Sequence, residues 1–210
     1  MTANPAEPLP RVLRERVQEL LDTGRRRVLG IAGAPGAGKS TLSAALLDAF
    51  PAQCVVVPMD GFHLAQSELE RIGRATRKGA PDTFDAAGYV ALLRRLRAAE
   101  ETVYAPEYRR ELHNPVAGAI AVPVDVPLVI TEGNYLLLAD HGFAPVRGLL
   151  DECWFVDLAE DVRIERLVRR HVATGKAPEA ARAWTLGPDQ RNADLVAGTA
   201  ARADRRVRVG

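Results

Sequence analysis

The sequence has almost no net charge, few cysteines and no long apolar run, and each shortage excludes a class of protein. Its 210 residues carry 28 Lys and Arg against 27 Asp and Glu, a formal net charge of +1. Such a nearly equal number of positive and negative residues does not indicate bulk binding to nucleic acid or to an anionic membrane surface. No apolar stretch approaches the roughly 20 residues that a membrane-spanning helix needs. We therefore expect neither nucleic acid nor membrane as a partner.

The two cysteines, Cys54 and Cys153, each lie within an apolar run. Two isolated cysteines form neither a disulfide framework nor a zinc site. Because free cysteine is among the most buried residue types, we expect reduced thiols in core strands. Residues 1–11 lack the basic and apolar segments of a secretory signal, so we expect a cytoplasmic protein by default.

Short apolar runs alternate with amphipathic ones along most of the chain, whose length suits one domain, residues 1–210. Strands are predicted over 27–31, 54–59, 102–105, 128–131, 152–157 and 206–209, with hairpin or edge structure over 115–127. Helices are predicted over 9–23, 39–50, 64–72, 161–173, 175–184 and 192–202, and over a stretch that Asp85 caps. Buried strands that alternate with helices predict a parallel sheet covered on both faces.

The segment GAPGAGKST, residues 33–41, satisfies G-x-x-x-x-G-K-[ST] between a predicted strand and a predicted helix. Small residues let the backbone wrap closely, so that its N–H groups point at phosphate oxygens. The helix N-terminus adds partial positive charge. We expect Lys39 to reach the β- and γ-phosphates and Ser40 to bind Mg²⁺. The predicted nucleotide-binding residues are Gly33, Ala34, Pro35, Gly36, Ala37, Gly38, Lys39, Ser40 and Thr41.

Three predicted strands end in an acidic residue, and in a doubly wound sheet ligands gather at these ends. Asp60 precedes a glycine that would let the chain turn sharply, and we interpret Asp60 as the general base for a substrate hydroxyl or else as a turn residue. Glu132 is predicted to support Mg²⁺, directly or through water. Asp157 is either a third such acid or a cap for the helix that follows.

With these residues in place, the chain resembles the P-loop kinases that include type I pantothenate kinase, uridine kinase and phosphoribulokinase. The resemblance rests on MDGFH, RKGAPDTFDAAGYVALLRRLR, VYAPEYRREL and LVITEGNYLL, in that order. It is greater still to bacterial nucleoside/nucleotide-kinase-family proteins labelled fructose transport system kinases. It covers about residues 27–209, which is nearly everything except the first helix within residues 1–24.

The resemblance implies a P-loop NTPase fold, a three-layer α/β/α arrangement with a parallel five-stranded core sheet and a small lid. It implies ATP as donor, Mg²⁺, and phosphoryl transfer to a hydroxyl of a small metabolite, with Asp60 as base; relatives are often homodimers. The lid would span about residues 161–186, where arginines suit a developing phosphoryl charge. Of these, Arg163 is expected to be an ordinary helix residue. The predicted catalytic lid residues are Arg166, Arg169 and Arg170.

The substrate pocket is expected to combine aromatic, basic and amide side chains that stack on and hydrogen-bond a polar ligand. Its predicted residues are His63, Arg77, Lys78, Tyr104, Tyr108, Arg109 and Asn134. The acceptor stays open among a sugar, a nucleoside, pantothenate and glycerate. The alternative function is a non-kinase nucleotide-binding protein, although the sequence has neither the N-K-x-D of GTPase switches nor an LSGGQ-like segment.

Overall fold

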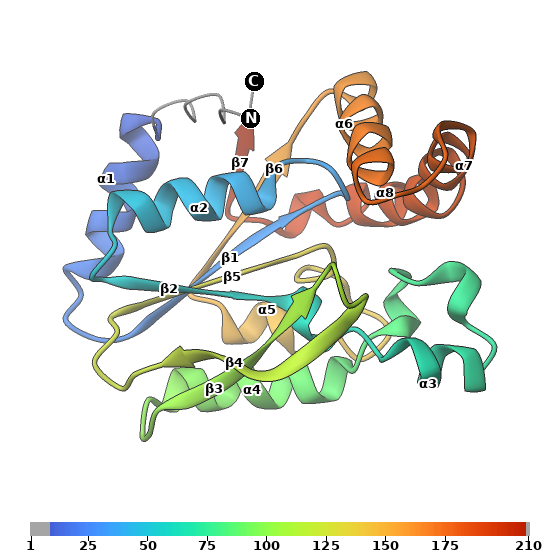
Figure 1. The fold of residues 1–210 in the computed structure, drawn as a ribbon. Helices are drawn as coiled ribbons and strands as arrows, with labels where there is room; N and C mark the ends of the chain where they lie inside the picture. The colour runs from blue at the N-terminus through green and yellow to red at the C-terminus, as the bar shows by residue number, and fades with distance from the viewer. Residues whose placement is uncertain (1–8, 209–210) are drawn as a thin grey trace.

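A five-stranded parallel sheet with helices on both faces forms the centre of the computed structural model, which describes residues 9–208 (Figure 1). The strand order is β2-β5-β1-β6-β7. The strands are β1 (Arg27–Gly33), β2 (Cys54–Pro58), β5 (Leu128–Gly133), β6 (Glu152–Asp157) and β7 (Arg205–Arg208). This confirms the predicted three-layer α/β/α architecture. Each core strand overlaps its predicted range. The last residue of the strand predicted over 206–209, residue 209, lies outside the described residues.

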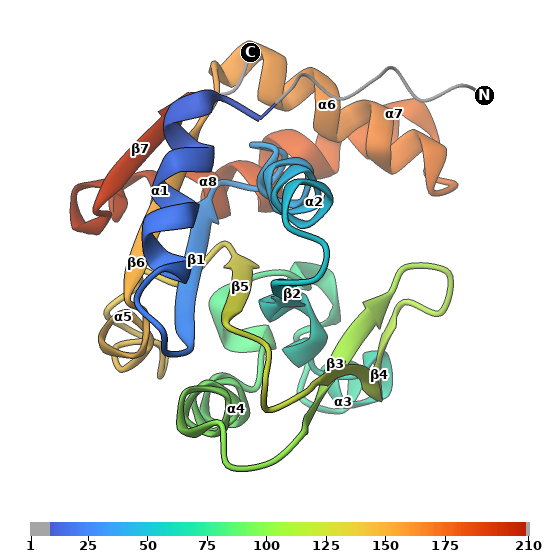
Figure 2. The same cartoon turned by 90° about the vertical axis from the view of Figure 1, so that its left-hand side faces the viewer.

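Two apolar cores lie on opposite faces of this sheet, because successive side chains of a strand point to opposite faces. Within β1, Val28 belongs to one core, while Leu29 and Ile31 belong to the other. Helices α4 (Ala86–Ala98), α5 (Val146–Leu149) and α8 (Gln190–Ala197) cover the first face, and α1 (Arg11–Leu21) and α2 (Lys39–Ala49) the second. Figure 2 shows α2 and α4 on opposite sides of the sheet.

Local sequence signals explain where the helices begin and end. In α1, Leu13, Val17 and Leu20 are buried, as their helical spacing predicts. Gly24 follows at φ 68°, the left-handed region that favours glycine after a helix. The carboxylate of Asp85 accepts a hydrogen bond of 2.8 Å from the backbone N–H of Gly88 and so caps α4, as predicted.

The remaining elements flank the carboxyl ends of the parallel strands (Figure 1). On one side lie η1 (Met59–Phe62), α3 (Gln66–Arg71), η2 (Ala75–Arg77), η3 (Pro81–Thr83) and the antiparallel hairpin of β3 (Val103–Arg109) and β4 (Asn114–Val122). On the other side lie α6 (Glu160–Ala173), α7 (Pro178–Trp184) and η4 (Thr185–Asp189). The short η5 (Ala200–Arg202) precedes β7, at the amino end of that strand. The hairpin confirms the prediction for residues 115–127. The predicted helix over 192–202 is instead divided between α8 and η5, and α5 was not predicted.

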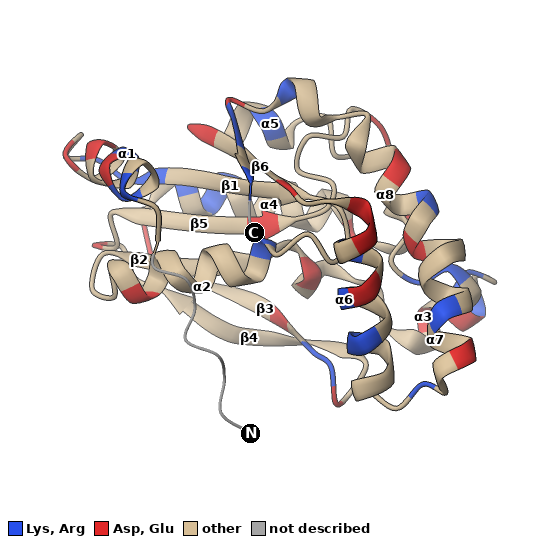
Figure 3. Cartoon of the chain, turned by 90° about the horizontal axis from the view of Figure 1, so that it is seen from above, with Lys and Arg blue, Asp and Glu red and all other residues tan. Residues whose placement is uncertain are grey.

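Charge and burial agree with the compositional predictions. Figure 3 shows acidic and basic positions interspersed along α6 and α7. Cys54 and Cys153 are free and buried, and burial raises the pKa of their thiols to about 11 and about 12. Among residues 9–208, no helix combines the length and apolar character that crossing a membrane requires.

Candidate active site

The phosphate loop lies between β1 and α2, in the strand–loop–helix setting predicted from sequence. Gly36 and Gly38 adopt φ of 81° and 99°, which glycine tolerates without a steric penalty. A Cβ on Gly36 would also lie 2.7 Å from Cγ of Leu167, so glycine allows α6 to approach the loop closely. The turn therefore brings residues 33–41 to the N-terminus of α2, where backbone N–H groups are available to an anion.

Lys39 is buried and held by three oxygen atoms. Its Nζ donates hydrogen bonds to the carbonyls of Gly33 and Ala34, both at 3.0 Å, and to Oδ1 of Asn134 at 2.7 Å. Burial lowers the pKa of Lys39, while the nearby charges of Glu132 and Asp60 oppose this shift. The ammonium group is thus fixed inside the loop, and Asn134 positions it as well as lining the cavity.

Ser40 and Glu132 are joined across α2 and β5. The Ser40 hydroxyl donates to Oε1 of Glu132 at 2.7 Å. Burial raises the pKa of Glu132 and the charge of Asp60 raises it further, whereas Lys39 lowers it. Hydroxyl and carboxylate oxygens are hard ligands of the kind that Mg²⁺ prefers. Among residues 9–208, no group of three or more His, Cys, Asp and Glu side chains is arranged to hold a metal ion.

Asp60 lies in η1, directly after β2. Gly61 does not have the positive φ that a sharp turn would need; instead its missing Cβ lets η1 approach β3, where a Cβ would lie 2.3 Å from the Pro106 carbonyl oxygen. Nδ1 of His63 lies 2.8 Å from the backbone carbonyl of Asp60. The His63 ring packs on Tyr108, with centroids 4.8 Å apart. Burial lowers the pKa of His63, which favours its neutral form. The rings of His63 and Tyr108 together form an aromatic wall.

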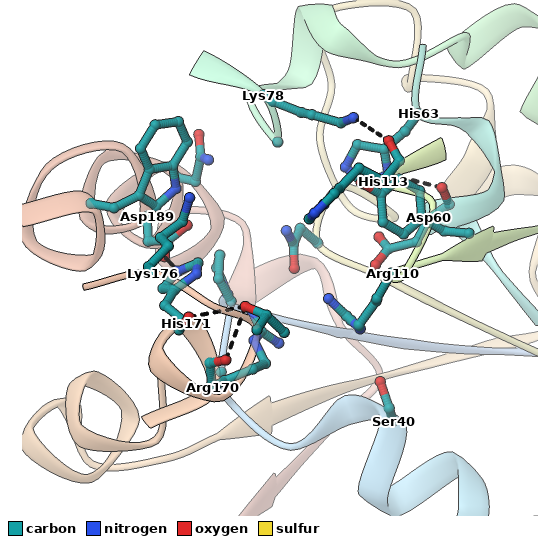
Figure 4. A pocket seen from close by; sticks show the side chains of 18 of the residues that line it. Ser40, Asp60, His63, Lys78, Arg110, His113, Arg170, His171, Lys176 and Asp189 are labelled. Atoms are coloured by element: carbon teal, nitrogen blue, oxygen red, sulfur yellow. Dashed lines mark hydrogen bonds and ion pairs between the residues drawn. The ribbon is translucent and has the colours of Figure 1, made fainter. Parts of the chain in front are cut away.

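These residues line one cavity of about 340 Å³. It runs from the phosphate loop, past Asp60 and Glu132, to the β3–β4 hairpin on one side and α6–α7 on the other (Figure 4). A second cavity of about 310 Å³ adjoins residues 36–41 and the face of α6 that carries Arg166 and Arg170. Lys39, Ser40 and Arg170 line both cavities.

The structure brings four of the seven predicted pocket residues to the first cavity, namely His63, Lys78, Tyr108 and Asn134. The other three lie outside it. Tyr104 is 61% exposed, Arg77 forms an ion pair with Asp82, and Arg109 pairs with Glu107 at 2.6 Å. Arg109 lies outside the cavity because successive side chains of a strand point in opposite directions, so that Tyr108 faces inward and Arg109 outward.

The predicted arginines of α6 divide according to helical phase. Arg166 and Arg170, four residues apart on one face, line the second cavity. Arg170 is exposed to the two cavities that it lines, but the surrounding protein partly desolvates its guanidinium group, and this desolvation and the charge of Arg110 lower its pKa. Arg169 lies on another face, is exposed and pairs with Glu165 at 3.4 Å.

Arg163 is buried rather than an ordinary exposed helix residue. Its Nη1 donates to the Pro35 carbonyl at 3.5 Å, and its Nη2 donates to Oε1 of Gln190. Nearby, Nε2 of His171 lies 2.7 Å from Oδ2 of Asp189 and joins α6 to η4. These contacts connect the start and end of α6 to the phosphate loop and to η4–α8.

Several cavity residues were not predicted from the sequence: Arg110, His113, Lys176, Trp184, Asp189 and Asn192. Arg110 follows the last residue of β3, so strand alternation alone does not identify it. His113 lies in the turn between β3 and β4, and the others lie within or beside α7, η4 and α8, whose placement the sequence did not indicate.

Comparison with known proteins gives consistent results. A family model described as the phosphoribulokinase/uridine kinase family matches residues 28–186. A Schizosaccharomyces pombe protein, provisionally named a uridine kinase, is 35% identical over 173 residues, which is 78% of this chain and 74% of the relative. An ATP-dependent kinase-like protein of Aspergillus versicolor is 38% identical over 146 residues, 65% of this chain and 85% of the relative. A crystal structure from Silicibacter sp. TM1040, provisionally described as a fructose transport system kinase, has a TM-score of 0.86 at 37% identity, covering 93% of this chain and 97% of that one.

Proposed function

Since the chain belongs to the phosphoribulokinase/uridine kinase family, we propose that it is an ATP-dependent kinase that phosphorylates a hydroxyl of a small metabolite. The observation that carries this proposal is that Asp60 lines the same cavity as Lys39, Ser40 and Glu132. A phosphate loop alone serves hydrolysis or switching equally well. A carboxylate facing that loop, beside the aromatic wall of His63 and Tyr108, is what a hydroxyl acceptor requires.

In this proposal the triphosphate of ATP lies on residues 33–41, and its ribose extends into the second cavity beside Arg166. Lys39 contacts the β- and γ-phosphates. Ser40 and Glu132, which are hydrogen-bonded to each other, would hold Mg²⁺, Glu132 either directly or through water. When bound, Mg²⁺ neutralises charge on the β- and γ-phosphate oxygens.

Asp60 orients the acceptor and takes its proton. The hydroxyl oxygen forms a bond to the γ-phosphorus while the bond from that phosphorus to the bridging oxygen breaks, and the electron pair leaves with ADP. The hydroxyl proton passes to the Asp60 carboxylate. Arg170 lies where negative charge accumulates on the transferred group, and residues 161–186 act as the lid that excludes water.

Acceptor-dependent turnover tests the proposal. Purified protein is incubated with Mg-ATP and a panel of sugars, nucleosides and hydroxy acids, ADP release is followed, and the phosphorylated product is identified by mass spectrometry. We expect one class of acceptor to raise ADP release well above the acceptor-free rate, and the Lys39→Ala variant to lose that increase. ATP binding without acceptor-stimulated turnover across the panel would instead support the alternative, a non-kinase nucleotide-binding module.

A further inference from the structure

The basic residues beside the first cavity fall into two groups, according to whether an acidic residue neutralises them. Arg77 and Arg109 point away from the cavity and form ion pairs with Asp82 and Glu107. Their sequence neighbours Lys78 and Arg110 point into it. Within residues 9–208, no carboxylate forms an ion pair with either of these two. The chain thus directs two uncompensated cations into the site.

Uncharged groups hold Lys78 in place. Its Nζ donates to the backbone carbonyl of His113 at 2.6 Å and to Oε1 of Gln66 at 3.3 Å, and it lies 5.4 Å from the centroid of the Tyr108 ring. An ammonium group has three N–H donors, so these contacts leave one donor for a ligand. They fix the direction of the side chain without cancelling its charge, and burial lowers the pKa of Lys78.

Lys78 lies at the acceptor end of the cavity rather than at the phosphate loop. The charge of Arg110 lowers the pKa of Lys39 and of Arg170, so Arg110 acts electrostatically on the phosphoryl side. At His63, in the aromatic wall, burial lowers the pKa and the charges of both Lys78 and Arg110 lower it further, whereas Lys78 is not among the charges that shift the pKa of Lys39 or of Arg170. Figure 4 shows Lys78 beside His113, at the end opposite Arg170. The triphosphate therefore has cations of its own, and Lys78 remains for another ligand.

We propose that the acceptor is itself anionic, with a carboxylate or phosphate monoester that Lys78 binds while its hydroxyl faces Asp60. The inference rests on the proposed kinase function. An anionic group forms a short, charge-assisted hydrogen bond with the free donor of Lys78 and supplies the missing countercharge. A neutral sugar or nucleoside leaves that charge partly desolvated and unpaired. The phosphorylated product retains the original anion and gains one phosphate ester.

Matched pairs of compounds test the inference: glycerate with glycerol, pantothenate with pantothenol, and ribulose 5-phosphate with ribulose. The carboxylate and phosphate pairs distinguish the two sources of charge. The thermal midpoint of the protein bound to Mg²⁺ and a non-hydrolysable ATP analogue reports binding, and ADP release reports turnover. We expect at least one anionic member to raise the midpoint and its neutral partner to raise it much less, with kcat/KM about tenfold or more in favour of the anion.

A variant links this preference to the residue. Lys78→Gln should raise KM for the anionic acceptor about tenfold or more while KM for ATP changes less than about twofold. Arg71→Gln removes a charge from exposed Arg71, which pairs with Glu68 on α3, and is the matched control. Circular dichroism of both variants verifies folding.

The outcomes separate the two proposals. The inference is overturned if neutral partners bind as well as the anions, if no anion raises the midpoint, or if Lys78→Gln raises KM for ATP and acceptor alike. Anions that bind through Lys78 without being phosphorylated would support the anion site and count against the kinase.

Discussion

At the scale of single residues, two carboxylates at neighbouring strand ends differ in their surroundings. Glu132 is buried and accepts the Ser40 hydrogen bond, and burial raises its pKa. Asp60 lies in η1, half-buried, at the mouth of the acceptor region. The more open carboxylate is better situated to receive a proton from an incoming hydroxyl, and the enclosed one to support a metal ion.

Asp60→Asn should therefore lower kcat by about 10²–10⁴-fold and leave KM for ATP within about threefold of the original value. The amide keeps the shape of the side chain but cannot accept the proton. Steady-state kinetics with a saturating acceptor measure both constants. Asp157→Asn is the matched control, because Asp157 also ends a strand but does not line the cavity that contains Lys39. Full turnover by Asp60→Asn would show that the base is another group.

Substitutions of two adjacent arginines of α6 should differ sharply in their effect on kcat. Arg170 lines both cavities, whereas Arg169 lines neither of them and pairs with Glu165. Arg170→Ala should lower kcat by about 10²–10³-fold, since it removes a preorganised positive charge from the transferred group. Arg169→Ala should change kcat less than about twofold, because exposed ion pairs contribute little. Equal losses in both variants would contradict the assignment by helical phase.

At the scale of elements, two glycines set how closely η1, which carries Asp60, packs on its neighbours: Gly133 on the side of Glu132 and Gly61 on the side of β3. A Cβ on Gly133 would lie 2.6 Å from Cβ of Met59, and one on Gly61 would lie 2.3 Å from the Pro106 carbonyl oxygen. Both are closer than a Cβ can approach without movement of its neighbour. The D-G-F and T-E-G segments thus provide packing contacts as well as the acidic residues, which explains why a glycine stands at both positions.

Gly61→Ala should destabilise the fold by about 1–3 kcal/mol, because the clash is with backbone of β3 rather than with a flexible side chain. It should also lower kcat, since η1 must shift and carry Asp60 with it. Urea unfolding gives the free energy of unfolding, and kinetics give kcat. Gly148→Ala is the control: a Cβ there meets no atom within 4 Å and should cost nothing. Unchanged stability in Gly61→Ala would mean that η1 and β3 are not held at this separation.

Some of this arrangement could be predicted from sequence because it depends on short segments. The phosphate loop and the acid-ended strands each follow from a local pattern, so the sequence alone predicts Lys39, Ser40, Asp60 and Glu132 as site residues, and the structure brings all four to one cavity. The predicted pocket residue Arg109 does not line the cavity, whereas its neighbour Arg110 does, and which of the two faces inward depends on the register of a hairpin. β3 has an irregularity between Ala105 and Glu107 that no composition signal announces. In the same way, the path of the loop determines that Lys78 lines the cavity and Arg77 does not.

At the scale of the whole molecule, residues far apart in the chain meet at one cavity. Lys78 and Arg110 come from one side and Arg170 and Lys176 from the other, with the phosphate loop between them. Figure 1 shows that α6 and α7 extend beyond the end of the sheet. The cations on both sides face a common space, so a polyanion there should draw the two sides together and stabilise the entire fold.

Binding of a non-hydrolysable ATP analogue with Mg²⁺ should therefore raise the thermal midpoint. At 100 times the dissociation constant, the gain is about 2.7 kcal/mol, which corresponds to roughly 5–10 °C for a domain of this size. Lys39→Ala should lose most of that shift. Its midpoint without nucleotide should change little. The substitution removes the hydrogen bonds of Lys39, but it also removes the unfavourable burial of a charged ammonium group, which the lowered pKa of Lys39 reflects.

Differential scanning calorimetry of the original protein and Lys39→Ala, each with and without nucleotide, measures the four midpoints. Arg95→Gln removes an exposed cation that pairs with Glu101 on α4, far from the loop, and should retain the full shift. An undiminished shift in Lys39→Ala would contradict the proposed position of the triphosphate. A large fall in its nucleotide-free midpoint would mean instead that Lys39 and its hydrogen bonds to Gly33, Ala34 and Asn134 hold the loop together.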